Sequence, residues 1–330
     1  MAKKIALLIG VSEYGEGIPP LSAPLNDVEA MQQVLQNPKL GDFDRVEPLS
    51  NPGLIEMRKA IVKLFKEADN KDDLVLLYFS GHGLYNQDNE DHLYLANRIS
   101  ANDDFEATAV EANFIQVRLN LCRAKRRVVI LDACFSGAYA NCWEAKGDSV
   151  VNIKQQLEQQ LGAKGSVVLT SSSATEKSFE NKDSKLSLYT KHLVNGIRSG
   201  AADKDNDGNI FIYELHDYAK EKVKEENDKM TPNIIVNEEG YKIIIAKALI
   251  KFDAEVVRNK PSELERLINI HFPPDELNEV LYICSDISYE EFPGKNREEK
   301  VKALIVKLQE ENYTQTFIEE MKKQKPDVFL

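Results

Sequence analysis

Two short apolar runs in the first half of the chain end abruptly in polar residues. Residues 128–131 (VVIL) lead into residues 132–137 (DACFSG), and residues 74–79 (LVLLYF) lead into residues 80–83 (SGHG). Continuous apolar runs of this length are typical of strands that are buried on both faces of a parallel sheet. Because ligands bind at the carboxyl ends of such strands, the pattern predicts that both polar tips belong to a functional site.

Strand and helix patterns alternate along the first 248 residues. Strand-like runs occur at 5–9, 45–49, 74–79, 92–96, 128–131, 166–170 and 241–246. Apolar residues with helical spacing occur at 28–35, 54–68, 114–123, 151–161 and 186–198. Strands that alternate with helices in this way indicate an α/β domain with a largely parallel sheet, in which both polar tips lie within one sheet.

Three further segments of the α/β domain allow specific structural predictions. Asp27 precedes the first helical pattern and is a candidate for its N-terminal cap. Ile55 is expected to face the core with the other apolar residues of helix 54–68. Residues 85–111 are polar and acidic, so we expect a long surface excursion beside the site, with 92–96 as its one strand-like piece.

The pattern changes after residue 248, where no further strand-like run occurs and apolar residues keep helical spacing. Pro261 and Pro293 mark breaks between the expected helices. The chain is therefore divided into an α/β domain at 1–248, a linker at 249–261 and a small all-α domain at 262–330.

The net charge of −12 over 330 residues argues against nucleic acid as a partner, because phosphate binding needs clustered Lys and Arg. The one dense basic run, 123–127, is interpreted as a solvated helix end. No run is long enough to span a membrane, and no signal peptide is recognisable. The four cysteines show no CxxC spacing, which favours free thiols in a reducing cytoplasm and no structural zinc.

The residues at the two polar tips are those of nucleophilic catalysis. Taken alone, Cys134 is equally well explained as a packed structural residue, and His82 as a structurally satisfied histidine. A histidine and a cysteine at two matched strand ends favour a nucleophile with its base.

The SGHG and DACFSG motifs resemble those of the caspase-like cysteine peptidases, and specifically the bacterial metacaspase (orthocaspase) branch, over residues 3–248. The resemblance implies a caspase-hemoglobinase fold, with a largely parallel central sheet flanked by helices. It also implies that Cys134 attacks a peptide carbonyl while His82 acts as general base and passes a proton to the leaving amine. The backbone amides of Gly83 and Cys134 would form the oxyanion hole. The chemistry needs no cofactor.

The resemblance also places the pocket for the substrate side chain on Asp27, Ser80 and Asp132. Metacaspases cut after Arg or Lys through an acidic pocket, whereas caspases proper hold Asp with arginines. Both acidic positions are acidic here, so we expect protein or peptide substrates with Arg or Lys at the cleavage site, with bidentate pairing favouring Arg. Pro24 departs from the pattern, because many metacaspases carry a cysteine there.

Residues 203–214 (DKDNDGNIFIYE) match the calcium-binding loop of an EF-hand. The expected ligands are Asp203, Asp205, Asp207, Asn209 (through its carbonyl oxygen) and Glu214. The alternative is an Asp-rich turn that caps the next helix, a feature of many bacterial caspase-like chains. Metacaspases commonly bind activating calcium elsewhere, on loops near the active site. The candidates for such a site are Asp88, Asp91, Asp103 and Asp104.

Two further forms of regulation are hypotheses. Lys146, Lys154 and Lys164 follow Cys134 in the chain. An enzyme that cuts after Arg or Lys could cleave itself at these residues and so become active. Residues 262–330 resemble the effector-associated domains of bacterial conflict systems, which are helical, death-like modules that pair with like domains. This implies an adaptor partner and a role in antiphage defence or programmed cell death. A helical lid on the peptidase is the other interpretation.

The first functional hypothesis is therefore a cysteine endopeptidase that cleaves after Arg or Lys and is regulated by calcium, self-cleavage or an adaptor partner. The alternative from another class is a catalytically idle signalling adaptor that is built on the caspase fold and acts through its helical tail. The intact His82 and Cys134 favour the enzyme.

Overall fold

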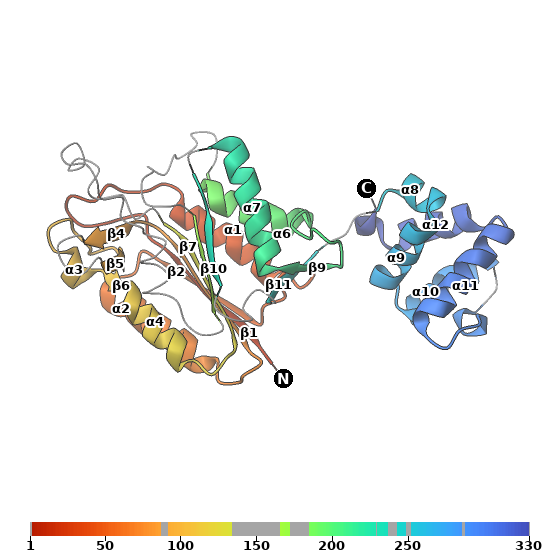
Figure 1. The fold of residues 1–330 in the computed structure, drawn as a ribbon, viewed down its shortest axis with the longest axis horizontal. Helices are drawn as coiled ribbons and strands as arrows, with labels where there is room; N and C mark the ends of the chain where they lie inside the picture. Colours follow the sequence, from red (N-terminus) through yellow and green to blue (C-terminus); the bar gives the residue numbers. More distant parts are fainter. Residues whose placement is uncertain are drawn as a thin grey trace. The chain divides into compact units, whose positions relative to one another are not determined.

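The computed structural model describes residues 2–86, 92–133, 166–171, 185–228, 230–236, 243–248, 252–285 and 288–329. The chain divides into two compact units, Met1–Ala248 and Leu249–Leu330, which are coloured red to green and blue in Figure 1.

A six-stranded sheet forms the centre of the first unit, with strand order β10-β8-β7-β3-β1-β2. The strands are β1 (Lys4–Gly10), β2 (Arg45–Ser50), β3 (Leu74–Ser80), β7 (Arg126–Asp132), β8 (Ser166–Thr170) and β10 (Asn233–Val236). All pairings are parallel except that of β10 with β8. Every residue of β3 is buried, as its continuous apolar run predicts. The predicted largely parallel sheet is confirmed.

Helices cover both faces of this sheet (Figure 1). Helices α1 (Pro24–Gln36), α6 (Leu188–Ser199) and α7 (Ile212–Glu226) lie on one face. Helices α2 (Leu54–Glu67) and α4 (Ala112–Leu121) lie on the other. Both layers bury apolar side chains against the strands, which is the arrangement expected for strands without a polar face.

Helix α2 packs only one side against the sheet. Met57, Ile61 and Leu64 are at most 2% exposed, but Ile55 is 69% exposed. The prediction that Ile55 faces the core is therefore wrong. Ile55 precedes Met57 by two residues, which places it about 200° around the helix axis and hence on the opposite side.

Helix α1 begins at a proline and has no side-chain cap. Its N-cap residue is Ala23, and Asp27 lies in the first turn of the helix. The prediction that Asp27 caps this helix is wrong, because Pro24 at the first position has no N–H that needs a partner. The carboxylate of Asp27 bonds instead to residues of other elements.

The segment expected as a surface excursion forms a small sheet of its own. Strands β4 (Gly83–Asn86), β5 (His92–Leu95) and β6 (Val110–Glu111) pair antiparallel, and α3 (Phe105–Thr108) joins β5 to β6. Leu84, Tyr94 and Phe105 bury their side chains against Ile18. The excursion prediction is thus wrong, since the few apolar residues of this acidic segment are enough to form a second, smaller core.

The strand predicted at 241–246 also differs. The structure has β11 at Ile244–Lys247, which pairs antiparallel with β9 (Asn209–Phe211) in a separate two-stranded sheet. The edge strand beside β8 in the main sheet is β10, whose four residues are too few to give a clear pattern in the sequence.

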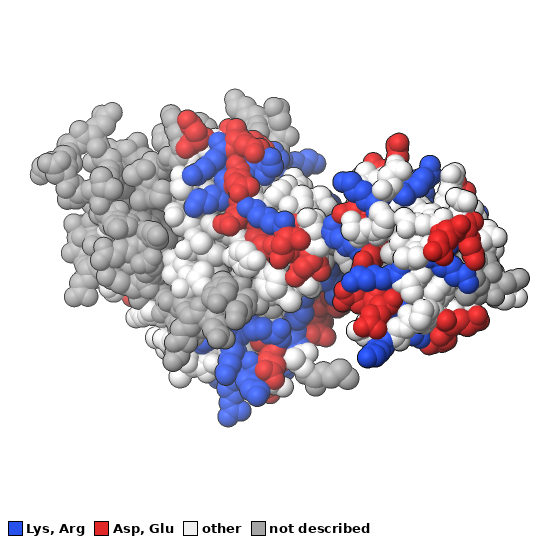
Figure 2. Space-filling model, turned by 45° about the vertical axis from the view of Figure 1, so that its right-hand side comes forward, with Lys and Arg blue, Asp and Glu red and all other residues white. Residues whose placement is uncertain are grey.

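The second unit is helical, as predicted for the chain after residue 248. It contains α8 (Ala254–Asn259), α9 (Pro261–His271), α10 (Pro274–Ser285), α11 (Arg297–Glu310) and α12 (Thr314–Gln324). The range predicted as a linker, 249–261, contains α8, because the Asp253 side chain caps that helix and Val257 is buried. On the face of this unit that Figure 2 shows, acidic and basic side chains are interspersed. Among the described helices, none combines the length and the apolar character that crossing a membrane requires.

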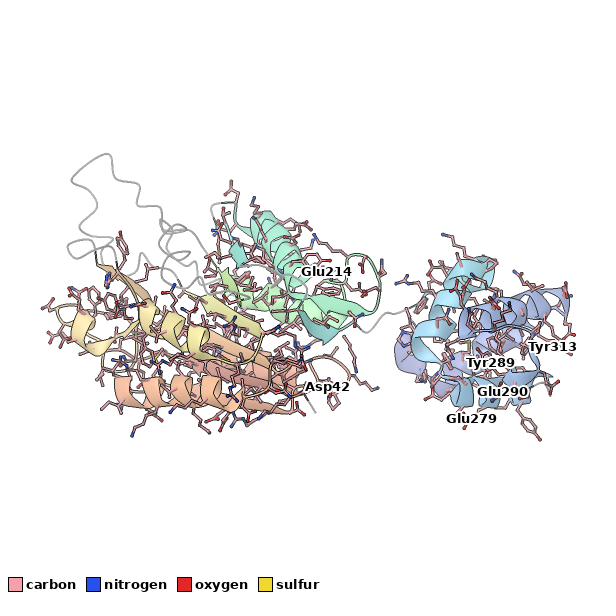
Figure 3. The ribbon with its side chains drawn as sticks, turned by 60° about the horizontal axis from the view of Figure 1, so that its bottom comes forward. Asp42, Glu214, Glu279, Tyr289, Glu290 and Tyr313 are labelled. Carbon is pink, nitrogen blue, oxygen red and sulfur yellow. The ribbon has the colours of Figure 1, made fainter. Side chains whose placement is uncertain are left out.

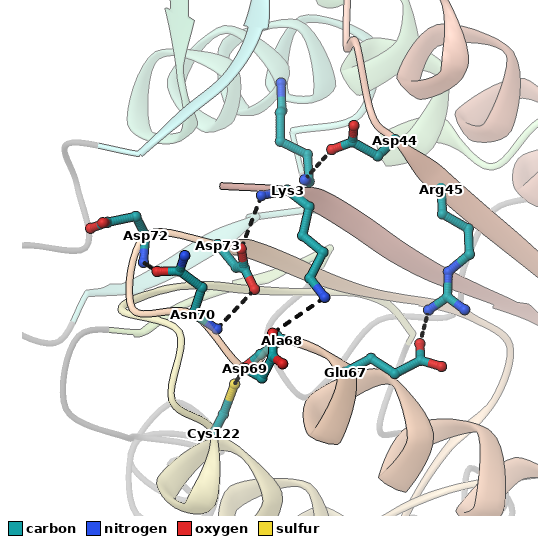
Figure 4. A network of polar contacts seen from close by, with 11 residues as sticks. Lys3, Asp44, Arg45, Glu67, Ala68, Asp69, Asn70, Asp72, Asp73 and Cys122 are labelled. Atoms are coloured by element: carbon teal, nitrogen blue, oxygen red, sulfur yellow. Dashed lines mark hydrogen bonds and ion pairs between the residues drawn. The ribbon is translucent and has the colours of Figure 1, made fainter. Parts of the chain in front are cut away.

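The buried carboxylate of Asp73 joins the beginnings of β1 and β3 (Figure 4). Its Oδ1 accepts the backbone N–H of Lys3 at 2.9 Å, and its Oδ2 accepts that of Asn70 at 3.1 Å. The two hydrogen bonds tie the loop before β3 to the neighbouring strand.

Asp73→Ala should lower the free energy of unfolding by about 1–3 kcal/mol, because two backbone donors lose their acceptor. Asp73→Asn, which keeps one acceptor oxygen, should lose less. Chemical denaturation measures both, with the neighbouring exposed Asp72→Ala as the control, expected to lie within about 0.5 kcal/mol of the parent. Equal stability of Asp73→Ala and Asp72→Ala would contradict this role.

Candidate active site

His82 stands between two strands, after the last residue of β3 and before β4. The turn that places it requires glycine at position 81. Gly81 has a φ of 158°, and a Cβ there would lie 2.9 Å from the Phe79 ring and 3.0 Å from the Tyr14 hydroxyl. The glycine before the histidine is thus explained by close approach of side chains.

The imidazole of His82 is 7% exposed and has a defined orientation. Its Nε2 lies 2.9 Å from the carbonyl oxygen of Pro19, its backbone N–H donates to the Tyr14 hydroxyl at 3.0 Å, and the two rings lie 4.8 Å apart. Because a carbonyl oxygen only accepts, Nε2 must carry the proton in this hydrogen bond. In the neutral ring Nδ1 is then the basic nitrogen.

The polar residues after β7 begin beside those after β3, at the carboxyl ends of two paired strands. β3 and β7 pair in register with Ser80 opposite Asp132, and the Gly81 N–H donates to the Asp132 carbonyl at 3.2 Å. Ala133, the residue before Cys134, lines the same pocket as His82. Cys134 itself lies outside the described residues. Asp88, Asp91, Lys146, Lys154 and Lys164 also lie outside them.

The structure brings together the three residues expected in the substrate pocket. Asp27 is fully buried, and its Oδ2 accepts the Ser80 hydroxyl at 2.8 Å while its Oδ1 accepts the backbone N–H of Ser187 at 2.9 Å. Asp132, at 8% exposure, lies beside it. Both carboxylates therefore face one small pocket.

Two residues that hold Asp132 were not found from the sequence. Its Oδ2 accepts the Thr190 hydroxyl at 2.6 Å, the Thr190 N–H at 3.2 Å and the Ser187 hydroxyl. The Tyr78 hydroxyl lies 2.6 Å from that of Thr190. The described residues make no hydrogen bond to Oδ1 of Asp132. The one sequence signal was a serine and a threonine at the beginning of a predicted helix, which more often mark a cap.

Asp27 binds its proton more tightly than an ordinary aspartate does. Burial, followed by the negative charge of Asp132, raises the pKa of Asp27 to about 7, although its hydrogen bonds to Ser187 and Ser80 act in the opposite direction. Asp27 is therefore about half protonated near pH 7.

The described lining of the pocket contains acids but no arginine or lysine. Among the described residues its lining is Leu21, Ala23, Pro24, Asp27, Ser80, Gly81, His82, Asp132, Ala133, Ser171, Ser187, Leu188 and Met230. No arginine or lysine of the described chain is among them. The arrangement suits a positively charged group that enters beside His82.

The Asp-rich loop lies between α6 and α7, as the EF-hand pattern requires. Asp203, Asp205 and Glu214 place their carboxylate oxygens within 4.8 Å of one another, and Figure 3 labels Glu214 at the beginning of α7. Positive φ angles at Asn206 (59°) and Gly208 (90°) fold the loop back on itself.

The three acids form an oxygen donor set of the kind that calcium prefers. Burial raises the pKa of both Asp203 and Glu214, as expected for carboxylates near one another without a cation. The Asp207 carboxylate is not in the cluster and accepts the N–H of Asn209 at 2.7 Å. The acids Asp103 and Asp104 belong to no such cluster within the described chain.

Comparison with known proteins identifies the family. Residues 3–239 match the Caspase domain family, which is more than half of the chain. Among solved structures, caspase-1 from Spodoptera frugiperda is similar, with 13% identity, coverage of 71% of this chain and 86% of that chain, and a TM-score of 0.49. No curated protein sequence matches significantly. From the match over residues 3–239, the chain belongs to the caspase-domain family of cysteine peptidases.

Proposed function

We propose that this chain is a cysteine endopeptidase of the metacaspase type that cleaves proteins or peptides after Arg or Lys. Cys134 is the nucleophile and His82 is the general base. The observation that carries the specificity is the pair of buried carboxylates, Asp27 and Asp132, in the pocket that His82 also lines.

The proposed reaction is acyl transfer in two steps. His82 uses Nδ1 to take the thiol proton of Cys134, and the thiolate attacks the peptide carbonyl carbon. The backbone amides of Gly83 and Cys134 stabilise the negative oxygen. His82 then donates its proton to the leaving amine, and a water molecule hydrolyses the thioester. The bond between His82 Nε2 and the Pro19 carbonyl keeps the ring orientation through both proton transfers.

A cationic side chain fits the pocket better than an acidic one. A guanidinium or ammonium group between Asp27 and Asp132 replaces the proton that Asp27 otherwise binds, and it pairs with both carboxylates. Oδ1 of Asp132 is the oxygen left without a protein partner in the described structure. An aspartate side chain would instead add a third negative charge to a buried pair.

Calcium is proposed as a regulator, bound by Asp203, Asp205 and Glu214 with contributions from Asp207 and Asn209. Glu214 accepts the N–H of Phe211 at 2.9 Å, so it also caps α7. Self-cleavage after Cys134 and an adaptor partner for residues 262–330 complete the proposed regulation, in antiphage defence or programmed cell death.

Fluorogenic peptides that end in Arg, Lys or Asp should separate the two functional hypotheses. The Arg and Lys peptides should be cleaved and the Asp peptide should not. Cys134→Ala and His82→Ala should each lower kcat/KM by about 10³-fold or more, since each removes half of the dyad. Cleavage that persists in Cys134→Ala excludes the proposed nucleophile, and silence with every peptide in the presence of calcium favours the idle adaptor.

The affinity for an Arg peptide should depend on pH through Asp27. Its pKa is raised to about 7, so the carboxyl is neutral below this pH and charged above it, and KM should fall as pH rises through about 7. In Asp27→Asn this dependence of KM should vanish, while kcat keeps the pH dependence of the dyad. We expect kcat/KM of the variant to be at least about 30-fold lower. An unchanged profile of KM against pH in the variant would refute the assignment.

Calorimetry should detect calcium binding to the wild-type chain. Asp205→Ala should weaken the binding at least about tenfold, because calcium affinity depends on the number of charged ligands. Asp205 is exposed, so its removal leaves the core intact. Asp217→Ala, which removes the same charge from the exposed side of α7, is the control. Absence of binding in the wild type, or equal binding by Asp205→Ala and wild type, rules out this loop as the site.

A further inference from the structure

The outer surface of α2 and α4 carries a shallow groove, which shares no lining residue with the pocket beside His82. Its volume is about 610 Å³, and its lining includes three apolar residues, Ile55, Val62 and Phe114, which we call its floor. It also includes Arg58, Lys59 and Lys66, which we call its rim. We call this surface the α2 groove.

The floor of the α2 groove is open to solvent. Ile55 is 69% exposed, although it belongs to a helix whose other side is fully buried. The Phe114 ring carries the guanidinium of Arg58 at 4.3 Å and that of Arg118 at 5.3 Å. An apolar floor with an aromatic ring between cations suits an aromatic or branched side chain flanked by acids.

The charge of the groove is not neutralised by its own neighbours. Within the described structure, Lys59 and Lys66 form no ion pair, whereas Lys63 is paired with Glu47 at 3.0 Å. Glu67, the one acid in the lining, is paired with Arg45. A basic surface with two uncompensated lysines on a chain of net charge −12 therefore calls for an acidic partner.

The second unit presents a surface with the opposite charge. Asp275, Glu279 and Tyr282 are spaced four and three residues apart on α10, so they lie on one side of the helix, and Ile283 is adjacent. Tyr282 is 74% and Ile283 60% exposed, the largest values for aromatic and aliphatic residues in the described part of this unit. Asp275 and Glu279 form no ion pair among the described residues, and Figure 3 shows Glu279 at the edge of the unit. We call this surface the α10 face.

We propose that the α2 groove of one copy of this chain binds the α10 face of a second copy. Tyr282 enters the groove against Phe114 and Ile55, and the acids of α10 meet the lysines of the rim. Aromatic anchors in apolar pockets give affinity, and complementary charges at the rim select the partner. The inference goes beyond the proposed function and does not depend on it.

The contact is heterologous, because the two surfaces are different. Each chain offers one groove and one face, so the same contact can repeat from copy to copy. Assembly then forms a ring if the rotation between copies closes, and an open chain if it does not. Either form gathers several peptidase domains into one particle.

Sedimentation of full-length protein tests the proposal, with Cys134→Ala as the background so that self-cleavage does not interfere. The average mass should rise with concentration at low salt and fall when salt is added. Lys59→Glu and Glu279→Lys should each weaken association at least about tenfold, since each places like charges together. Lys224→Glu and Glu310→Lys reverse exposed charges elsewhere and should have no effect.

Charge exchange makes the test specific for this pair of surfaces. In an equal mixture of Lys59→Glu and Glu279→Lys chains, the groove of each variant is opposite in charge to the face of the other variant. Association between the two variants should therefore return. The double variant should also associate with itself. Tyr282→Ala should weaken association, whereas Tyr313→Ala, at another exposed tyrosine, should not.

Several outcomes would overturn the proposal. One is a monomer at every concentration, and another is association that neither single reversal changes. A mixture that fails to restore association would show that these charges do not face each other. A change of shape without any dependence on concentration would place the contact within one chain.

Discussion

The parallel pairing of β3 with β7, in the register that sets Ser80 opposite Asp132, decides which side chains of this domain can meet. β3 is buried along its whole length, and β7 is buried except at Arg126. A shift of the register by one residue would move every side chain of a strand to the opposite face of the sheet and disrupt the packing of both faces. The register therefore places His82 and Asp132 at the carboxyl ends of two neighbouring central strands.

Burying two neighbouring carboxylates, Asp27 of α1 and Asp132 of β7, lowers the stability of the fold, and hydrogen bonds from the surrounding residues reduce this loss. Asp132 receives three hydrogen bonds from Ser187 and Thr190, and Asp27 receives one each from Ser80 and Ser187. Charge-assisted bonds of this kind stabilise an ionised carboxylate, but burial and the negative charge of Asp132 still raise the pKa of Asp27. A proton on Asp27 or a positively charged ligand relieves the repulsion between the two carboxylates, so the pocket is least stable when it is empty and deprotonated.

The sheet could be predicted from the sequence because its strands are continuous apolar runs, and the site could be placed because polar residues follow two of them. Ser187 and Thr190 could not be found in this way. They lie more than 50 residues from Asp132, and a serine or threonine at a helix start has an ordinary local explanation. Ile55 was assigned to the core because it is apolar, although its position around the helix axis places it on the opposite side from Met57 and Ile61. Its exposure is what makes it part of the α2 groove.

Helix α6 links the pocket to the Asp-rich loop. Its first residues hold Asp132, and its last turn leads through Gly200 into the loop that begins at Asp203. The helix is tied to α7 by the Tyr189 hydroxyl, which lies 3.1 Å from Nδ1 of His216. Burial lowers the pKa of His216 to about 3, so the ring is neutral at working pH. The proposed calcium loop and the donors of Asp132 thus lie at the two ends of one helix, α6, which also contacts α7 through Tyr189.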